Sequence, residues 1–231
     1  MREIVFDTET TGLSPLAGDR MVEIGCIELV NRIPSGRSFH AYFNPGRPMP
    51  RGAEEVHGLT DIFLSDKPVF AERAAELIEF LEDSRLVAHN AAFDFAFLNH
   101  ELGVCGRTIV CTSRMIDTLA IARIRHPGAK HSLDALCTRF GVDRSIRVKH
   151  GALIDAQLLA ACYIELTGGR QIGLGLVQAA VEAAAESLNR RPGEGPVRLP
   201  RPHAPSDAEL VAHADFLATI TDPIWMRAAH G

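Results

Sequence analysis

The sequence lacks an excess of basic charge, which limits how it could meet nucleic acid. It has 24 Lys and Arg against 29 Asp and Glu, so the formal net charge of its 231 residues is -5. Affinity for nucleic acid alone comes largely from the neutralisation of phosphates by cationic side chains. The charge therefore argues against a protein whose only task is to bind DNA or RNA. It does not argue against an enzyme that meets DNA through metal ions or a partner.

The sequence also lacks paired cysteines and long apolar runs. Its cysteines, at positions 26, 105, 111, 137 and 162, are odd in number, and no two are spaced as CxxC. This pattern predicts reduced, buried thiols in a cytosolic protein rather than a disulfide framework. No apolar run is long enough to span a membrane, and the first residues do not have the form of a signal peptide. We expect a cytoplasmic protein without a membrane partner.

Hydrophobic patterning predicts one α/β domain with a mixed sheet flanked by helices. Strand patterns occupy residues 2–6, 21–30, 37–43 and 85–89. Helical patterns occupy residues 70–84, 91–103, 115–125, 132–141 and 152–169. Asn90 and Ser132 are the expected N-caps, Gly103 and Gly168 the expected helix ends, and residues 45–52 an expected loop. Strands first, then strands mixed with helices, are typical of this architecture.

The composition changes after residue 170, which predicts a separate tail. Residues 189–205 hold five prolines and show no apolar periodicity, so they predict a flexible or extended linker. A short helical pattern, DAELVAHADFLATI, follows the linker. We therefore divide the chain into a domain over 1–170, a segment with the linker over 171–205, and an end segment over 206–231.

The first chemical pattern is the pair of acids in DTE, Asp7 and Glu9, at the end of an apolar strand. Residues two apart in a strand project to the same face, so the two carboxylates point the same way. Close carboxylates repel each other and raise each other's pKa unless a cation lies between them. Taken alone, the pair fits a solvated strand end as well as a metal site.

Two further patterns contain acids, and each has an ordinary structural explanation when taken alone. Asp94 lies among Phe93, Phe95 and Phe97, and a partly buried carboxylate there needs a partner or a metal, whereas an exposed helix acid needs neither. His150 and Asp155 are five residues apart, at the expected start of a helix. Asp155 could simply favour the helix dipole, and His150 could be a surface loop histidine.

The three patterns together, in this order, resemble the DEDDh 3′→5′ exonucleases, a family with a ribonuclease H-like fold. The matching motifs are DTE (7–9), NAAFD (90–94) and HGALID (150–155). Phosphodiester hydrolysis needs an activated water and neutralised phosphate charge, which two divalent ions can supply. Four carboxylates and no cysteine favour hard ions, Mg²⁺ or Mn²⁺. Asp7, Glu9 and Asp155 are the predicted metal ligands, Asp94 helps to hold a second ion, and His150 is the predicted general base.

Longer segments resemble one branch of this family, the proofreading (epsilon) subunits of bacterial DNA polymerase III. These segments are VEIG (22–25), VHGLTDIFLSDKP (56–68), SLDALC (132–137) and residues 150–169. The resemblance implies removal of mismatched nucleotides from a single-stranded DNA 3′ end as 5′-mononucleotides. It also implies that His57 lies near the terminal nucleotide, together with Asp7, Glu9 and Asp155. Gly52 stands where this branch usually has a nucleotide-contacting Glu.

The same resemblance implies partners for the tail. Gln171, Leu174 and Leu176 in QIGLGL fit the Q-x-x-L-x-L/F form of a sliding-clamp-binding segment, although an apolar turn packed on the domain fits them too. Residues 206–231 resemble the segment that binds the polymerase (alpha) subunit, and a small third core subunit stays open.

Two alternatives remain at this point. One is another DEDDh exonuclease that acts on RNA or short oligonucleotides; the clamp-like segment argues against it. The other is a catalytically dead scaffold that stabilises a polymerase; the presence of all five candidate residues argues against it.

Overall fold

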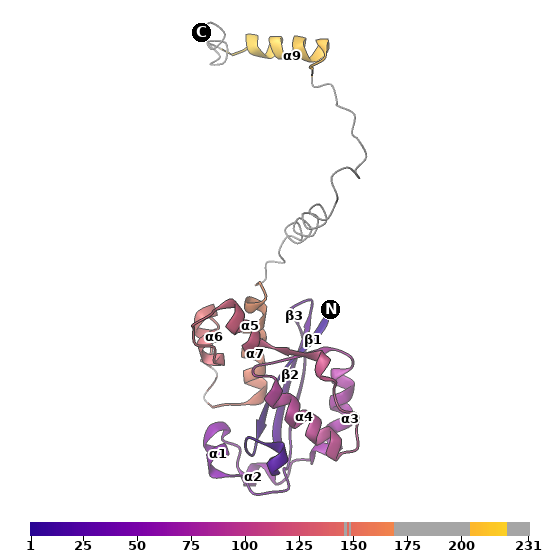
Figure 1. Ribbon diagram of the computed structural model, residues 1–231, viewed down its shortest axis with the longest axis vertical. Coiled ribbons are helices and arrows are strands. Elements are labelled where there is room, and N and C mark those ends of the chain that lie inside the picture. The colour runs from indigo at the N-terminus through magenta and orange to yellow at the C-terminus, as the bar shows by residue number, and fades with distance from the viewer. Residues whose placement is uncertain (146, 148, 169–203, 221–231) are drawn as a thin grey trace, which may run out of the picture. The chain divides into compact units, whose positions relative to one another are not determined.

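A computed structural model describes residues 1–145, 147, 149–168 and 204–220 (Figure 1). The chain divides into two units, Met1–Val177 and Gln178–Gly231. The segment with Gln171, Leu174 and Leu176, and the linker up to residue 203, lie outside the described residues. None of the helices in the described ranges is long and apolar enough to cross a membrane.

The first unit is built on a mixed sheet of five strands in the order β3-β2-β1-β4-β5. The strands are β1 (Arg2–Thr10), β2 (Met21–Val30), β3 (Ile33–Tyr42), β4 (Arg85–Ala88) and β5 (Met115–Asp117). β1, β2 and β3 pair antiparallel, whereas β4 runs parallel to β1 and β5 runs parallel to β4. The expected mixed sheet is confirmed, and β1 is its central strand.

Helices cover both faces of the sheet (Figure 1). They are α1 (Arg51–His57), α2 (Asp61–Leu64), α3 (Phe70–Leu81), α4 (Ala92–Val104), α5 (Thr118–Arg125), α6 (Leu133–Phe140) and α7 (Ala152–Leu166). The second unit holds α9 (Asp207–Ala218), which Ser206 and Glu209 cap reciprocally.

The two cores follow from the alternation of β1 side chains. Ile4 and Phe6 pack in a cluster with side chains of α3 and α4, and the Phe6 and Phe95 ring centroids are 5.7 Å apart. Val5 points to the opposite face, where it packs in a second cluster with Leu159 and Tyr163 of α7. Because odd and even positions of a strand face opposite ways, Asp7 and Glu9 continue the Val5 face toward α7, and Thr8 faces α4.

Several expected boundaries are wrong. Helix α1 begins inside the expected loop over 45–52, and β5 occupies the first residues of the helix expected over 115–125. Asn90 is not an N-cap: it has a φ of 62°, and Ala91 stands at the cap position of α4 without a side-chain hydrogen bond. Gly103 does not end α4, which continues to Val104. Ser132 does cap α6, because its side chain accepts a hydrogen bond from the Ala135 N–H.

Gly25 lets the first turn of α7 lie directly on β2. A Cβ atom added to this residue would lie 2.3 Å from both the Cα and the backbone nitrogen of Leu153, far inside any allowed contact. Gly25 is also the cross-strand partner of Asp7. The close approach of α7 therefore occurs beside the acidic end of β1, and it brings the first turn of the helix there.

Replacing Gly25 with alanine tests how α7 is seated. The added methyl group would overlap helix backbone, so we expect the free energy of unfolding in urea to fall by about 1–3 kcal/mol or more. Gly103→Ala in α4 is the matched control, because among the described residues nothing lies within 4 Å of its added Cβ. Alanine there should stabilise the helix by about 0.5–1 kcal/mol. Unchanged stability of Gly25→Ala would show that α7 does not lie against β2.

Candidate metal-dependent active site

Four carboxylates converge where β1 ends. Asp7 and Glu9 project from β1 toward α7, and Asp155 and Asp94 stand in the first turns of α7 and α4. Glu9, Asp94 and Asp155 are buried, and Asp7 is partly accessible to solvent. The first turn of a helix is a favourable place for a carboxylate, because free N–H groups and the helix dipole oppose its charge.

A metal-sized cluster exists within this group. One oxygen each of Glu9 and Asp155 and one nitrogen of His150 all lie within 4.8 Å of one another. Asp7 and Asp94 do not belong to that tightest set, but the negative charges of Asp94, Glu9 and Asp155 all raise the pKa of Asp7. The structure thus brings the three sequence motifs together at one end of the sheet.

Contacts on the α4 side orient Asp94. The Thr8 hydroxyl donates a hydrogen bond of 2.7 Å to Asp94 Oδ1. The turn before α4 is held from β5, because Asp117 Oδ1 accepts from the Asn90 N–H at 3.0 Å and also caps α5 through the Leu119 N–H at 3.0 Å. Sequence reasoning missed Asp117, although an Asp directly before a helical pattern is a recognisable cap signal.

An ion pair between a partly exposed arginine and a buried carboxylate joins the start of β2 to α4. Arg20 donates two hydrogen bonds of 2.7 Å to the carboxylate of Glu101, one to each oxygen. Glu101 is fully buried and also accepts from the Met21 N–H. Bidentate geometry gives such a pair both strength and a fixed orientation. It fastens the loop that follows Thr10 to the helix that carries Asp94.

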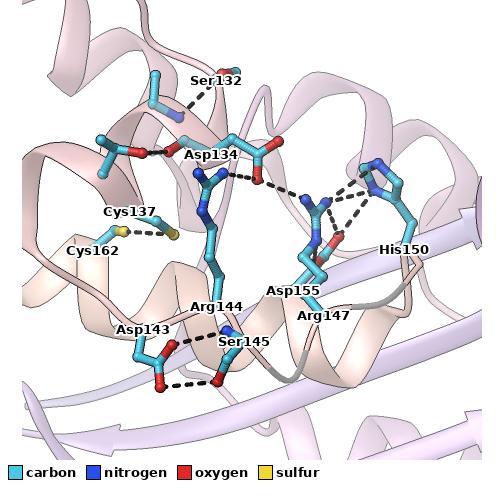
Figure 2. A network of polar contacts seen from close by, with 12 residues as sticks. Ser132, Asp134, Cys137, Asp143, Arg144, Ser145, Arg147, His150, Asp155 and Cys162 are labelled. Atoms are coloured by element: carbon cyan, nitrogen blue, oxygen red, sulfur yellow. Dashed lines mark hydrogen bonds and ion pairs between the residues drawn. The ribbon is translucent and has the colours of Figure 1, made fainter.

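The segment before α7 contributes His150 and an arginine that sequence reasoning missed. His150 Nδ1 lies 3.1 Å from Asp155 Oδ2 (Figure 2). Arg147 donates to both oxygens of the same carboxylate, from Nε at 2.5 Å and from Nη2 at 2.8 Å. Half of the His150 side chain is exposed. No motif pointed to Arg147, which precedes His150 by three residues and Asp155 by eight but belongs to none of the three motifs.

His57 lies at the end of α1 and is buried. Its Nδ1 accepts from the Leu59 N–H at 3.0 Å, and within the described residues Nε2 has no hydrogen-bond partner. Burial lowers the pKa of His57, which favours the neutral ring. Glu54, one helical turn earlier, is the acid of α1 whose charge acts on His57, whereas Glu55 pairs with Arg51.

Without a cation, the cluster is electrostatically strained. Burial, and then the charge of Glu23 across the strand pair, raises the pKa of Glu9 to about 8. Burial raises the pKa of Asp94 to about 7, although the Thr8 hydroxyl opposes the shift. Burial and four neighbouring carboxylates, those of Asp94, Glu9, Asp155 and Glu23, raise the pKa of Asp7 well above its usual range. At neutral pH these acids hold protons or repel one another.

The donor set fits divalent cations. Buried carboxylates that repel one another are stabilised by a cation between them, and oxygen ligands favour Mg²⁺ or Mn²⁺. No cysteine belongs to the cluster formed by the residues that the structure describes, so the softer thiolate ligands that favour zinc are not part of it. The residues that could hold such ions are Asp7, Glu9, Asp94 and Asp155, with His150 beside them.

Comparisons with known proteins point to one family. A family model described as "Exonuclease" (RNase_T) matches residues 4–163. A protein of Rickettsia felis named DNA polymerase III subunit epsilon is 48% identical over 226 residues, which cover 95% of this chain and 97% of that protein. The protein of the same name from Escherichia coli K12 is 46% identical over 176 residues, which cover 73% of this chain and 72% of that protein.

Solved structures share the fold. Exonuclease X in complex with 5′ overhanging duplex DNA has a TM-score of 0.55 and 26% identity over 71% of this chain and 90% of that chain. The nuclease domain of 3′hExo, a DEDDh family member, has a TM-score of 0.61 at 16% identity over 72% of this chain and 92% of that chain. The expected ribonuclease H-like architecture agrees with both.

The raised pKa values predict a pH-dependent stability when metal is removed by a chelator. Folded Glu9 and Asp94 keep protons up to about pH 8 and about pH 7, whereas unfolded Asp and Glu release them near pH 4. The folded state therefore binds more protons over this interval, and the free energy of unfolding falls as pH rises. Thermal and urea unfolding between about pH 5 and about pH 8.5, a range that spans both raised values, measures this slope.

Asp7→Asn should relieve part of that strain. At the upper end of the pH range we expect the metal-free variant to be more stable than wild type by about 1–3 kcal/mol, because one of the mutually repelling carboxylates is removed. Mg²⁺ should stabilise wild type but not the variant. Glu79→Gln, an exposed acid on α3, is the control and should change neither value. A metal-free wild type with pH-independent stability would contradict the electrostatic account.

Proposed function

This chain belongs to the exonuclease family, in the branch of the epsilon subunits of bacterial DNA polymerase III, and we propose that the acidic cluster at the end of β1 is its catalytic centre. As a member of that branch it is a 3′→5′ exonuclease that proofreads within a DNA polymerase III complex. The observation that supports the site is the convergence of Glu9, Asp155 and His150, from two separate motifs, within 4.8 Å.

The proposed roles follow from position and chemistry. Asp7, Glu9 and Asp155 hold two ions of Mg²⁺ or Mn²⁺ together with Asp94, which Thr8 orients. When bound, the ions supply an activated water and neutralise charge on the phosphate. The half-exposed ring of His150, next to Asp155, takes a proton from that water as general base. Release of a 5′-mononucleotide is the expected result.

The terminal nucleotide is proposed to lie between the acidic cluster and α1. His57 Nε2 is buried and has no hydrogen-bond partner in the part of the chain that the structure describes, which supports its assignment to the nucleotide beside Asp7, Glu9 and Asp155. Glu54 is the acid on α1 whose charge raises the pKa of His57. We propose that it takes the place of the Glu that the branch usually has at the position of Gly52.

Similarity to DNA polymerase III subunits supports DNA, rather than RNA, as the substrate. The DNA polymerase III relative from Rickettsia felis matches along 95% of this chain. Mismatched 3′ ends fray more easily than matched ends, so a site that accepts only a single strand would select them without reading bases. The other class, a scaffold without activity, would not need the strained acids of this cluster.

Replacing His150 with alanine tests the mechanism. We expect hydrolysis of a single-stranded DNA oligonucleotide with Mg²⁺ to fall by about 10²–10⁴-fold, because the general base is lost. Binding of Mn²⁺, measured by calorimetry, should survive. Wild type should lose activity with chelator and should degrade DNA faster than an RNA oligonucleotide of equal sequence. Near-normal turnover of the variant would remove His150 from the mechanism, and preference for RNA would favour the alternative.

The tail is proposed to hold two partners. Gln171, Leu174 and Leu176 would bind the sliding clamp, and residues 206–231 would bind the polymerase (alpha) subunit. On α9, Leu210, Val211 and Phe216 are half-exposed or more, and these apolar side chains supply an interface. A tether of this kind raises the effective concentration of the nuclease at the polymerase.

Deleting residues 190–231 tests the tether. We expect the truncated protein to degrade free single-stranded DNA at the wild-type rate, because the acidic cluster lies entirely within the first unit. It should no longer co-purify with the polymerase subunit. Gln171→Ala in the full chain is the companion variant: it should keep the polymerase subunit and lose the clamp. Co-purification of the deletion variant would refute the tether.

A further inference from the structure

Arg147 lies beside the candidate site, where it contacts Asp155, Asp134 and His150 (Figure 2). Its side chain is 11% exposed, and that of Asp155 is 4% exposed. Besides the two bonds to Asp155, Nη1 donates to Asp134 Oδ1 at 2.8 Å, and Nη2 lies 2.7 Å from His150 Nδ1. One guanidinium therefore joins Asp155, His150 and a more exposed acid on α6.

The contacts with Asp155 use the atoms that a metal would need. Both carboxylate oxygens accept hydrogen bonds from Arg147 in a planar fork. A divalent cation bound to the same carboxylate would lie beside the fixed positive charge of the guanidinium. Like charges so close in a buried setting repel strongly. Arg147 and a divalent ion therefore compete for Asp155.

The contact with His150 has a second consequence. Nδ1 lies 2.7 Å from the donor Nη2 of Arg147 and 3.1 Å from the acceptor Oδ2 of Asp155. In a neutral imidazole, one ring nitrogen either accepts or donates and cannot do both. If Nδ1 accepts from Arg147, Nε2 carries the hydrogen, and neither nitrogen is free to take a proton. In that tautomer, Arg147 keeps His150 from acting as the general base.

We propose that Arg147 is a displaceable placeholder cation: it occupies Asp155 and His150 until divalent metal arrives, and then gives up both contacts. This inference depends on the proposed role of Asp155 as a metal ligand. Asp134 provides the position to which the guanidinium can withdraw, because it already holds Nη1 at 2.8 Å and its side chain is half-exposed. In the metal-free protein the guanidinium of Arg147 balances the charge of Asp155. It also keeps His150 from acting as the general base until metal is bound.

Calorimetric titration of the free, full-length protein with Mn²⁺ tests the proposal without using activity. Arg147→Gln should bind Mn²⁺ about tenfold more tightly than wild type, which corresponds to Arg147 occupying Asp155 in about nine of ten metal-free molecules. Arg144→Gln is the matched control, because Arg144 pairs with the same Asp134 oxygen at 3.0 Å. It removes the same charge from the same segment and should change the Mn²⁺ affinity by less than about twofold.

Asp155→Asn tests the proposed metal site independently of the placeholder role of Arg147. Loss of Mn²⁺ binding in this variant supports the proposed site, and retention of wild-type binding would overturn that site and the placeholder with it. If Asp155→Asn loses Mn²⁺ while Arg147→Gln binds it as wild type does, or more weakly, then only the placeholder role is wrong. Equal tightening by Arg144→Gln would likewise overturn it, because general charge removal would then explain the effect.

Thermal unfolding with and without Mn²⁺ distinguishes a change in metal affinity from a folding defect. Metal-free Arg147→Gln should melt below wild type with chelator, because Asp155 is left buried without its cation. Saturating Mn²⁺ should raise its melting temperature by more than it raises that of wild type, as tighter binding to the folded state requires. A smaller Mn²⁺-induced rise than in wild type would contradict the proposal.

Discussion

Repulsion among carboxylates at the end of β1 is the constraint on which the rest of this structure depends. Three of the four acids are buried, where unpaired charge is costly. The protein opposes that cost with the free N–H groups at the starts of α4 and α7, with the Thr8 hydroxyl, and with Arg147. None of these removes the strain on Asp7 and Glu9, so the site keeps a strong attraction for added positive charge.

Because side chains alternate along β1, this one strand contributes residues of the site to both helical layers. Odd positions of β1 give Asp7 and Glu9 to the layer of α7, and the even position Thr8 gives its hydroxyl to α4. The site therefore exists only where both layers meet the same strand end. The Arg20–Glu101 pair and the Asp117 cap hold the loops on the α4 side in place, so the acids stay close despite their repulsion.

Sequence reasoning reached the mixed sheet, the long helix α7 and the motif residues, because these depend on local periodicity and on residue types at fixed spacing. It missed α1 and α2, which are short, and β5, whose three residues lie directly before a helical pattern. Asn90 looked like a cap, but the turn is held by Asp117, 27 residues away. Arg147 lies near His150 and Asp155 in sequence but belongs to none of the motifs. Contacts between distant residues leave no local pattern, and the roles of the tail and of the site residues stay proposals.

The close contact between the start of α7 and Gly25 restricts insertions and deletions in the first turn of this helix. Leu153 lies against Gly25 of β2, two residues before Asp155. The contact between Leu153 and the sheet therefore sets the position of the Asp155 carboxylate. Each added or deleted residue between them would rotate the helix by about 100° and carry Asp155 away from β1. Substitution along the outer face of α7 is therefore better tolerated than an insertion or deletion between Leu153 and Asp155.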